Sequence, residues 1–168
     1  MGLFKPAWQS DNKEKALRAF NKLSEKKALM ALNILTDQSI LIDIVKSGIT
    51  NYYVRMEAVK KLTDQALLAD VVKYVSDSNL KGVKYDLLKE AIEKLIDQAL
   101  LADVAKINDL GFHKKGFEQI GGFRVQTINE EWYVSEEAVK KLTDQALLVD
   151  VAKNAKHMNV RKMAAEKL

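Results

Sequence analysis

The sequence contains no cysteine and a single proline, Pro6, in 168 residues. Without cysteine the chain can form neither a disulfide framework nor a thiolate metal site, and it has no Cys nucleophile. No residue pattern therefore indicates an oxidising compartment, and we expect a cytoplasmic protein. One proline and seven glycines leave long stretches without helix-breaking residues. Because Ala, Leu and Lys dominate these stretches and favour helices, the composition indicates an all-α fold.

Long apolar runs are also lacking. No run approaches the roughly 20 residues that a helix needs to cross a bilayer, and the first six residues lack the apolar segment of a secretory signal. We therefore expect no membrane partner. With 48% apolar residues, the chain is long enough for one hydrophobic core. The prediction is a single domain that spans residues 1–168.

Arginine is scarce among the charged residues. The formal charge is +4, from 27 basic and 23 acidic residues, but only Arg18, Arg55, Arg124 and Arg161 are arginine. Arginine binds phosphate and guanine through two parallel hydrogen bonds, whereas lysine acts as a point charge. Lysines interleaved with Asp and Glu are typical of a solvated helical surface. The charge pattern therefore favours an ordinary surface over a nucleic-acid-binding face.

The main feature that is present is an internal repeat. The phrase LTDQALLADV begins at Leu62 and returns as LTDQALLVDV at Leu142, with diverged copies at Leu35 and Leu95. These anchor leucines, with Leu168, are separated by 26 residues or more. A unit of about 26 residues fits two short helices and two turns.

Residues at fixed distances after each anchor leucine show what the unit contains. The second and third residues are always Asp and Gln, the eighth is Asp and the eleventh is Lys, as in Asp64, Gln65, Asp70 and Lys73. The fifth, sixth, ninth and tenth are apolar, which makes one broad apolar face on a helix. We call this helix B and expect it at about 65–75 in the unit of Leu62.

A second helix, helix A, precedes each anchor leucine. Four residues before the leucine stands an alanine in every unit, a small residue that allows helices to approach closely; the five are Ala31, Ala58, Ala91, Ala138 and Ala164. In the unit of Leu62 we expect helix A at about 54–62. The last helix is expected at 160–168. Residues 11–24 predict an additional amphipathic helix that caps the N-terminal side.

Residues at the turn between helices A and B indicate how the two helix ends are capped. The Asp after each anchor leucine predicts an N-cap for helix B, because its carboxylate can accept hydrogen bonds from the free N–H groups of the first turn. The Lys before four of the anchors lies in the last turn of helix A, where a cation suits the negative end of the helix dipole.

These tandem helix pairs, with Val-Arg at Val54-Arg55 and Val160-Arg161 and an Asp at the tight turn, resemble HEAT-like (armadillo-type) repeats, specifically the short bacterial form. The resemblance covers residues 25–168 and departs from the pattern at Lys84 and Ser135. It implies a right-handed α-α superhelix, a solenoid of two-helix repeats, whose members mostly act as scaffolds or binding modules. It transfers no functional residues.

An insertion at 108–134 separates one helix B from the next helix A. It holds four of the seven glycines, and Gly121-Gly122 can form a two-residue hairpin turn between residues 118–120 and 123–125. Long insertions in repeats often form binding loops. The candidate partner-binding residues are Phe112, Phe117, Phe123, Arg124, Trp132 and Tyr133. The alternative is that these aromatics fold back and cover the adjacent repeats.

Catalytic and metal-binding patterns are weak. The two histidines, His113 and His157, are far apart in sequence, and neither has the spacing of a helical metal site. The Asp column of helix B has a Lys three residues later, which is the spacing of a surface ion pair rather than of paired catalytic carboxylates. We expect no enzyme activity, cofactor, metal or catalytic residue.

Together these observations predict a non-enzymatic binding or scaffold module. It mediates protein–protein interaction through the solenoid surface and the 108–134 insertion, with an unidentified protein partner. The alternative is a nucleic-acid-binding HEAT-like protein that uses its Lys-rich faces, which the Asp column opposes by diluting the basic charge.

Overall fold

The computed structural model describes residues 6–10, 12–47, 50–77, 84–107, 112–120, 123–132 and 134–168, with the strands at 112–132 described by their backbone. The described residues separate into two compact units, one ending at Lys94 and the other beginning at Leu95. Each unit is described by itself. The expected single domain stays a prediction.

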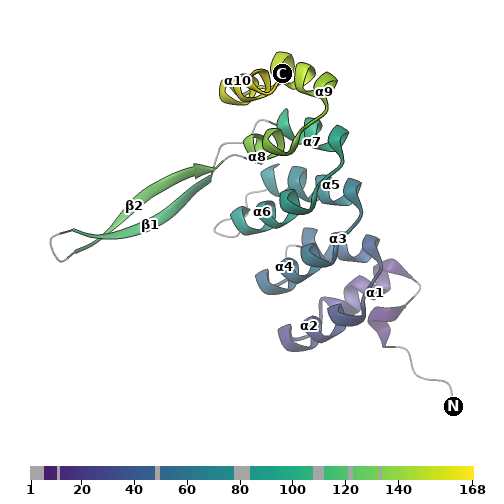
Figure 1. Ribbon diagram of the computed structural model, residues 1–168. Coiled ribbons are helices and arrows are strands. Elements are labelled where there is room, and N and C mark those ends of the chain that lie inside the picture. Colours follow the sequence, from purple (N-terminus) through teal and green to yellow (C-terminus); the bar gives the residue numbers. More distant parts are fainter. Residues whose placement is uncertain are drawn as a thin grey trace. The chain divides into compact units, whose positions relative to one another are not determined.

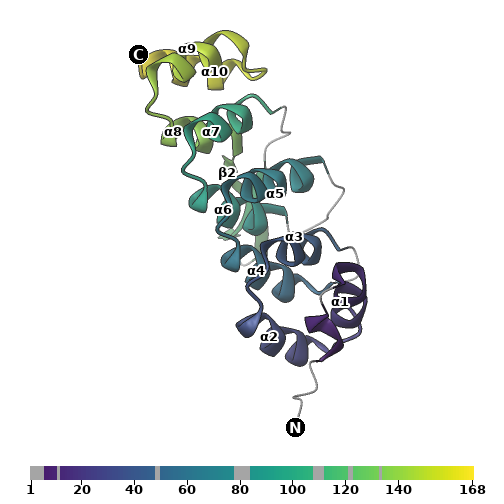
Figure 2. The ribbon, with the colours of Figure 1, turned by 90° about the vertical axis from the view of Figure 1, so that its right-hand side faces the viewer.

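Helices dominate both units (Figure 1, Figure 2). The first unit contains the 3-10 helix η1 (Ala7–Gln9) and the α-helices α1 (Lys13–Phe20), α2 (Glu25–Ile34), α3 (Gln38–Lys46), α4 (Tyr52–Lys61), α5 (Gln65–Asp77) and α6 (Lys84–Lys94). The second contains α7 (Gln98–Ala105), strands β1 (Phe112–Ile120) and β2 (Phe123–Trp132), α8 (Val134–Lys141), α9 (Gln145–Asn154) and α10 (Met158–Glu166).

Each anchor leucine marks the end of a helix A. Leu35 and Leu62 close α2 and α4 with extended backbone angles, and the N–H of Leu62 still bonds to the carbonyl of Ala58 at 3.1 Å. The next helix, a helix B, begins three residues later. The alanine four residues before the anchor is buried in every repeat. The prediction of A–B helix pairs is therefore confirmed, with bounds that shift by two residues or fewer in α4, α5 and α10.

Within each unit the A helices and the B helices form separate layers. In the first unit α4 packs against α2 and α6, while α3 packs against α1 and α5. In the second unit α8 packs against α10 and α7 against α9. The core lies between the layers because each helix directs its apolar face toward the other layer. The additional N-terminal helix is confirmed as α1, which is shorter than expected and is capped by Asn12, whose side chain accepts from Lys15 N.

The expected core is mostly correct. In the units of Leu62, Leu95 and Leu142, the sixth and ninth residues after the anchor are buried, as the apolar face predicts: Leu68, Val71, Leu101, Val104, Leu148 and Val151. The prediction was wrong for the fifth position after the anchor, where Leu67, Leu100 and Leu147 are only half-buried. At 100° per residue this position lies at the edge of the arc formed by the sixth, ninth and tenth residues, so its side chain reaches the rim of the core.

The insertion adds strands to the helical fold. β1 and β2 pair antiparallel, with Ile120 opposite Phe123 and Phe112 opposite Trp132. The predicted hairpin is therefore confirmed as a pair of strands, and the expected all-α class holds for the helices but not for this segment. One extra residue on β2, Asn129, produces a bulge opposite Lys114 and Lys115. The two glycines at 121–122 lie outside the described residues.

No helix in the described part of the chain is both long and apolar enough to cross a membrane.

Leu148→Ala tests the helical core. Leu148 is 1% exposed, so truncation should leave a cavity and lower the free energy of unfolding by ~2–5 kcal/mol. Val149→Ala is the matched control, because Val149 is the next residue of α9 and is 37% exposed; it should change stability by about 0.5 kcal/mol. Urea denaturation measures both, and equal midpoints would contradict the assigned core.

Candidate functional site

The repeated glutamine joins consecutive A–B turns. Gln38 Oε1 accepts from the backbone N–H groups of Thr63 (2.8 Å) and Asp64 (3.3 Å), and its Nε2 donates to the carbonyl of Lys61 at 3.3 Å. The Gln38 side chain thus satisfies backbone N–H and C=O groups in the turn between α4 and α5 that have no partner within those helices. Gln98 makes the same bonds in the second unit, to Lys141, Thr143 and Asp144.

The repeated aspartate caps helix B as predicted. Asp37 accepts from Ser39 N at 2.8 Å and Ile40 N at 3.2 Å. Asp64, Asp97 and Asp144 each accept from a backbone N–H three residues later at 3.0 Å. The pKa of Asp37 is lowered, chiefly by the hydrogen bond from the Ser39 hydroxyl.

The lysine before the anchor acts on the neighbouring repeat rather than on its own helix end. Lys61 Nζ donates to the carbonyls of Leu32 and Asn33 at the end of α2. Lys94 does the same at the end of α4, and Lys167 at the end of α8. The predicted cation at a helix C-terminus is therefore present, but the carbonyls that it satisfies belong to the preceding A helix. Partial burial lowers the pKa of Lys94.

The Asp and Lys columns of helix B also connect neighbours. Lys46 pairs with Asp70 at 2.5 Å, and Lys106 pairs with Asp150 at 2.8 Å. The expected pair within one helix occurs as well, because Lys106 reaches Asp103 at 3.5 Å. The expectation of pairs confined to one helix was incomplete. The stacked B helices bring the Lys of one repeat beside the Asp of the next.

The arginines of the two Val-Arg pairs bond to backbone carbonyls in the connections that precede their helices. Arg55 is buried and its Nε donates to the carbonyl of Thr50 at 3.1 Å. Arg161 donates to the carbonyls of Ala155 (2.7 Å) and Lys156 (2.9 Å). These three bonds hold the connection that leads into each arginine's own helix. The residues that repeat in the sequence thus serve the scaffold, and a candidate site must be sought among residues that do not repeat.

A groove lies between α2 and α4, on the A layer of the first unit, and its lining includes residues that differ between repeats, such as Leu29, beside Glu57 and Lys60, which recur as Glu137 and Lys140. Its volume is about 880 Å³. It is lined by five residues of α2 and five of α4: Glu25, Lys26, Leu29, Met30 and Asn33, and Tyr52, Tyr53, Met56, Glu57 and Lys60. Met30 and Tyr53 are 63% and 61% exposed. Large apolar side chains thus remain in solvent along a groove between two packed helices.

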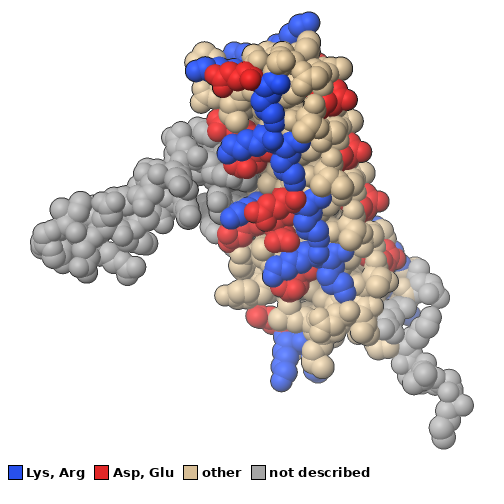
Figure 3. All heavy atoms as spheres, viewed as in Figure 1, with Lys and Arg blue, Asp and Glu red and all other residues tan. Residues whose placement is uncertain are grey.

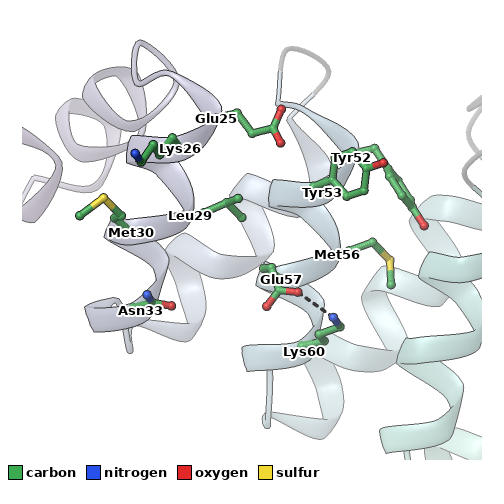
Figure 4. A pocket seen from close by; sticks show the side chains of 10 residues that line it. All are labelled: Glu25, Lys26, Leu29, Met30, Asn33, Tyr52, Tyr53, Met56, Glu57 and Lys60. Atoms are coloured by element: carbon green, nitrogen blue, oxygen red, sulfur yellow. Dashed lines mark hydrogen bonds and ion pairs between the residues drawn. The ribbon is translucent and has the colours of Figure 1, made fainter.

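The close view shows how the groove is built (Figure 4). Glu25 and Leu29, one turn apart on α2, point toward α4, whereas Met56 extends from α4 in the direction away from α2. Lys26 and Met30 lie farther round α2. The groove therefore has one apolar lining residue on each helix at this level, Leu29 and Met56, and an acidic group at the end where the two helices begin.

Two tyrosine rings stand at that end. The ring centroids of Tyr52 and Tyr53 lie 5.3 Å apart with planes inclined by 60°. The hydroxyl of Tyr52 donates to Asp86 Oδ2 of α6 at 2.6 Å, which fixes the ring. Burial, followed by this bond to the carboxylate, raises the pKa of Tyr52 to about 12. The Tyr52 ring is thus held by its hydroxyl, and Tyr53 beside it is 61% exposed.

Charges surround the groove unevenly. Lys60 is paired with Glu57 at 2.7 Å, and this bond raises the pKa of Lys60. Glu25 accepts a hydrogen bond from the neutral amide of Asn51 at 3.0 Å, and no described cation lies within ion-pair distance of its carboxylate. The end near the tyrosines is therefore net acidic. Elsewhere on the visible faces of the two units, basic and acidic side chains alternate (Figure 3).

The sequence-predicted site residues lie in the insertion. Phe112 and Phe117 are in β1, while Phe123, Arg124 and Trp132 are in β2. The register places Phe112 opposite Trp132, but Phe117 opposite Gln126 and Arg124 opposite Gln119. Their side chains, and Tyr133 altogether, lie outside the described residues. The expectation that these six residues form a partner-binding site stays a prediction.

The groove residues were missed by the sequence reasoning, although a signal was present. Six residues before the anchor, the first two repeats have Leu29 and Met56, whereas the later repeats have Lys89, Glu136 and Lys162. An apolar residue at a surface position where the later repeats carry a charged one indicates that this surface has a role that the later repeats do not share.

Neither histidine is part of a described cluster. His113 lies in β1 and His157 directly precedes α10. Within the described ranges, no group of three His, Asp or Glu side chains is arranged to hold a metal ion.

Comparison of the chain with protein-family models, with curated proteins and with solved structures gives no match.

The Lys106–Asp150 bridge yields a pH prediction. The hydrogen bond from Lys106, followed by one from Asn154, holds the pKa of Asp150 below its ordinary value. Lys106→Met should therefore raise the pKa of Asp150 toward that value, as measured by NMR titration of the carboxyl carbon. Because the folded-state pKa is lowered, the bridge stabilises the fold above the ordinary pKa, and its contribution is lost as pH falls through the lowered one.

Lys156→Met is the control for this titration. It removes the same charge from an exposed residue that has no described bond to Asp150. If the two variants give the same pKa for Asp150, the bridge does not form in solution.

Proposed function

We propose that this chain is a HEAT-like repeat protein whose helix pairs form a right-handed superhelix, and that it acts as a non-enzymatic module that binds other proteins. The helix pairs with buried alanines, capping aspartates and inter-repeat glutamines support the repeat assignment. Bonds of this kind recur from one repeat to the next and make a rigid scaffold on which binding residues can be placed.

The exposed groove between α2 and α4 carries the proposal. A structural surface has no need of Met30 and Tyr53 in solvent beside Leu29 and Met56. Contiguous exposed apolar area rimmed by polar residues is typical of a surface that binds another protein. Methionine adapts its shape to a partner, and tyrosine supplies a rigid contact with a polar end.

The 108–134 insertion is the second part of the proposed binding surface. It interrupts the repeats with a hairpin in which β1 has 9 residues and β2 has 10. Nearly identical repeats cannot easily encode a unique site, so specificity belongs where the copies differ. Such an appended element is a common place for partner selection in repeat proteins.

Nucleic-acid binding is the less favoured alternative. Several lysines that could form a basic face are engaged, as Lys61 and Lys94 bond to carbonyls and Lys46 and Lys106 to carboxylates. A continuous basic groove would require these groups to be available to phosphates.

Replacing residues 109–133 by a short turn like that at 156–159 tests the role of the insertion. The helices should stay folded, because repeats are stabilised mainly by themselves and their neighbours, while partners captured from a lysate by the intact chain should be lost. Circular dichroism, thermal melting and affinity capture on the same variant measure the three properties.

A loss of stability in the deletion variant would show that the insertion covers the neighbouring repeats instead of binding a partner. If the aromatics cover the repeats, deletion lowers stability by several kcal/mol, as roughly 100 Å² or more of apolar area is exposed per ring. A stable deletion variant that still captures every partner would show that the insertion does not select them.

We expect duplex DNA to bind weakly and without sequence preference, because basic and acidic side chains alternate on the visible faces of the units. Fluorescence anisotropy with two unrelated duplexes at two salt concentrations measures this. Weak binding should decrease steeply at the higher salt. Tight binding of one duplex that persists at the higher salt would instead support the nucleic-acid alternative.

A further inference from the structure

We infer that the α2–α4 groove takes a segment of a partner protein in which a lysine or arginine stands beside apolar residues. The basic group lies against Tyr52 and Tyr53 next to Glu25, and the apolar side chains lie on Leu29 and Met56. This inference rests on the proposed protein-binding function and specifies the chemistry of the segment that the groove recognises.

The apolar half follows from the apolar residues that line the groove. Leu29 points from α2 toward α4, and Met56 lines the same groove from α4 with its side chain extending away from α2; Met30 extends from the side of α2 that faces away from α4 (Figure 4). A volume of about 880 Å³ accommodates several side chains rather than one. Helices and extended peptides both bind such grooves through a few apolar anchors.

The basic half follows from the end of the groove. Two aromatic rings 5.3 Å apart and inclined by 60° present ring faces, and a cation within about 6 Å of such a face is attracted by the ring quadrupole. Glu25 stands at the same end and is hydrogen-bonded by a neutral amide, not by a cation. Asp86 adds a second negative charge at the Tyr52 hydroxyl, to which it is hydrogen-bonded.

An acidic segment fits less well. Of the two lysines that line the groove, Lys60 is already paired with Glu57, and Lys26 lies farther round α2 than Leu29 (Figure 4). A carboxylate placed near the tyrosines would meet Glu25 without a compensating cation. The charges at this end of the groove are therefore complementary to a basic group and not to an acidic one.

A displayed library of random peptides tests the inference. The full chain is immobilised, enriched peptides are sequenced, and one of them is synthesised with a fluorescent label for anisotropy titration. We expect the enriched peptides to share a lysine or arginine next to apolar residues. Replacing that basic residue by alanine should weaken binding about fivefold or more.

Groove variants locate the binding. Tyr53→Ala should weaken the labelled peptide about fivefold, whereas Tyr53→Phe keeps the ring and should keep the affinity. Glu25→Gln removes the charge but retains an oxygen that can accept from Asn51. On Glu25→Gln, the peptide's lysine-to-alanine change should matter less than on the unmodified chain, which a double-mutant cycle measures.

Matched controls come from the second unit. Glu166→Gln removes one exposed carboxylate, and Met158→Ala removes one side chain that is 72% exposed. Neither should change the affinity. Circular dichroism of every variant confirms that the exposed substitutions leave the helices intact.

The outcomes separate the inference from the proposed function. Enriched peptides that are acidic or lack a basic residue overturn the inference and leave peptide binding in place. A second outcome concerns basic peptides that bind elsewhere: if replacing residues 109–133 weakens their binding and the Tyr53 and Glu25 substitutions do not, the inference is overturned while peptide binding by the chain stands. A library from which nothing is enriched overturns the inference, while the capture experiment on the intact chain judges the proposed function independently.

Discussion

Hydrogen bonds between successive A–B turns are the interaction on which the rest of the structure depends. Every helix end leaves backbone groups without partners, and here two sets of such ends meet at each turn. The aspartate satisfies N–H groups within its own repeat, whereas Gln38 and Lys61 reach across repeats to satisfy the carbonyls and N–H groups of a neighbour. Because these bonds are directional, they set both the spacing and the register of the helices within each unit.

That spacing produces the groove. Helices of the A layer in the first unit are held side by side by the turns at one end and by the buried alanines along their length. The residue six places before the anchor lines the groove in both repeats, with Leu29 pointing toward α4 and Met56 away from α2. Both residues are apolar, and the charged residues Lys89 and Glu136 stand at the same position in later repeats. The scaffold is common to the repeats, and the binding chemistry is added to it locally.

The two candidate surfaces are related through the repeat. Trp132 and Tyr133 stand ten and nine residues before Leu142, which is where Tyr52 and Tyr53 stand before Leu62. The insertion therefore ends in an aromatic pair at the positions where α4 begins with one.

The sequence by itself determined the helix pairs, the capping aspartates and most of the core, because these follow from local periodicity and from the unsatisfied ends of helices. It also contained the turn that allows the hairpin. Which repeat the side chains of Gln38, Lys61 and Lys46 bond to was decided by tertiary structure, since a long polar side chain meets its partner only after the helices have stacked. The groove has the same origin. Leu29 and Tyr53 do not stand out along the chain, and they line one surface only because α2 and α4, which are not consecutive helices, pack side by side.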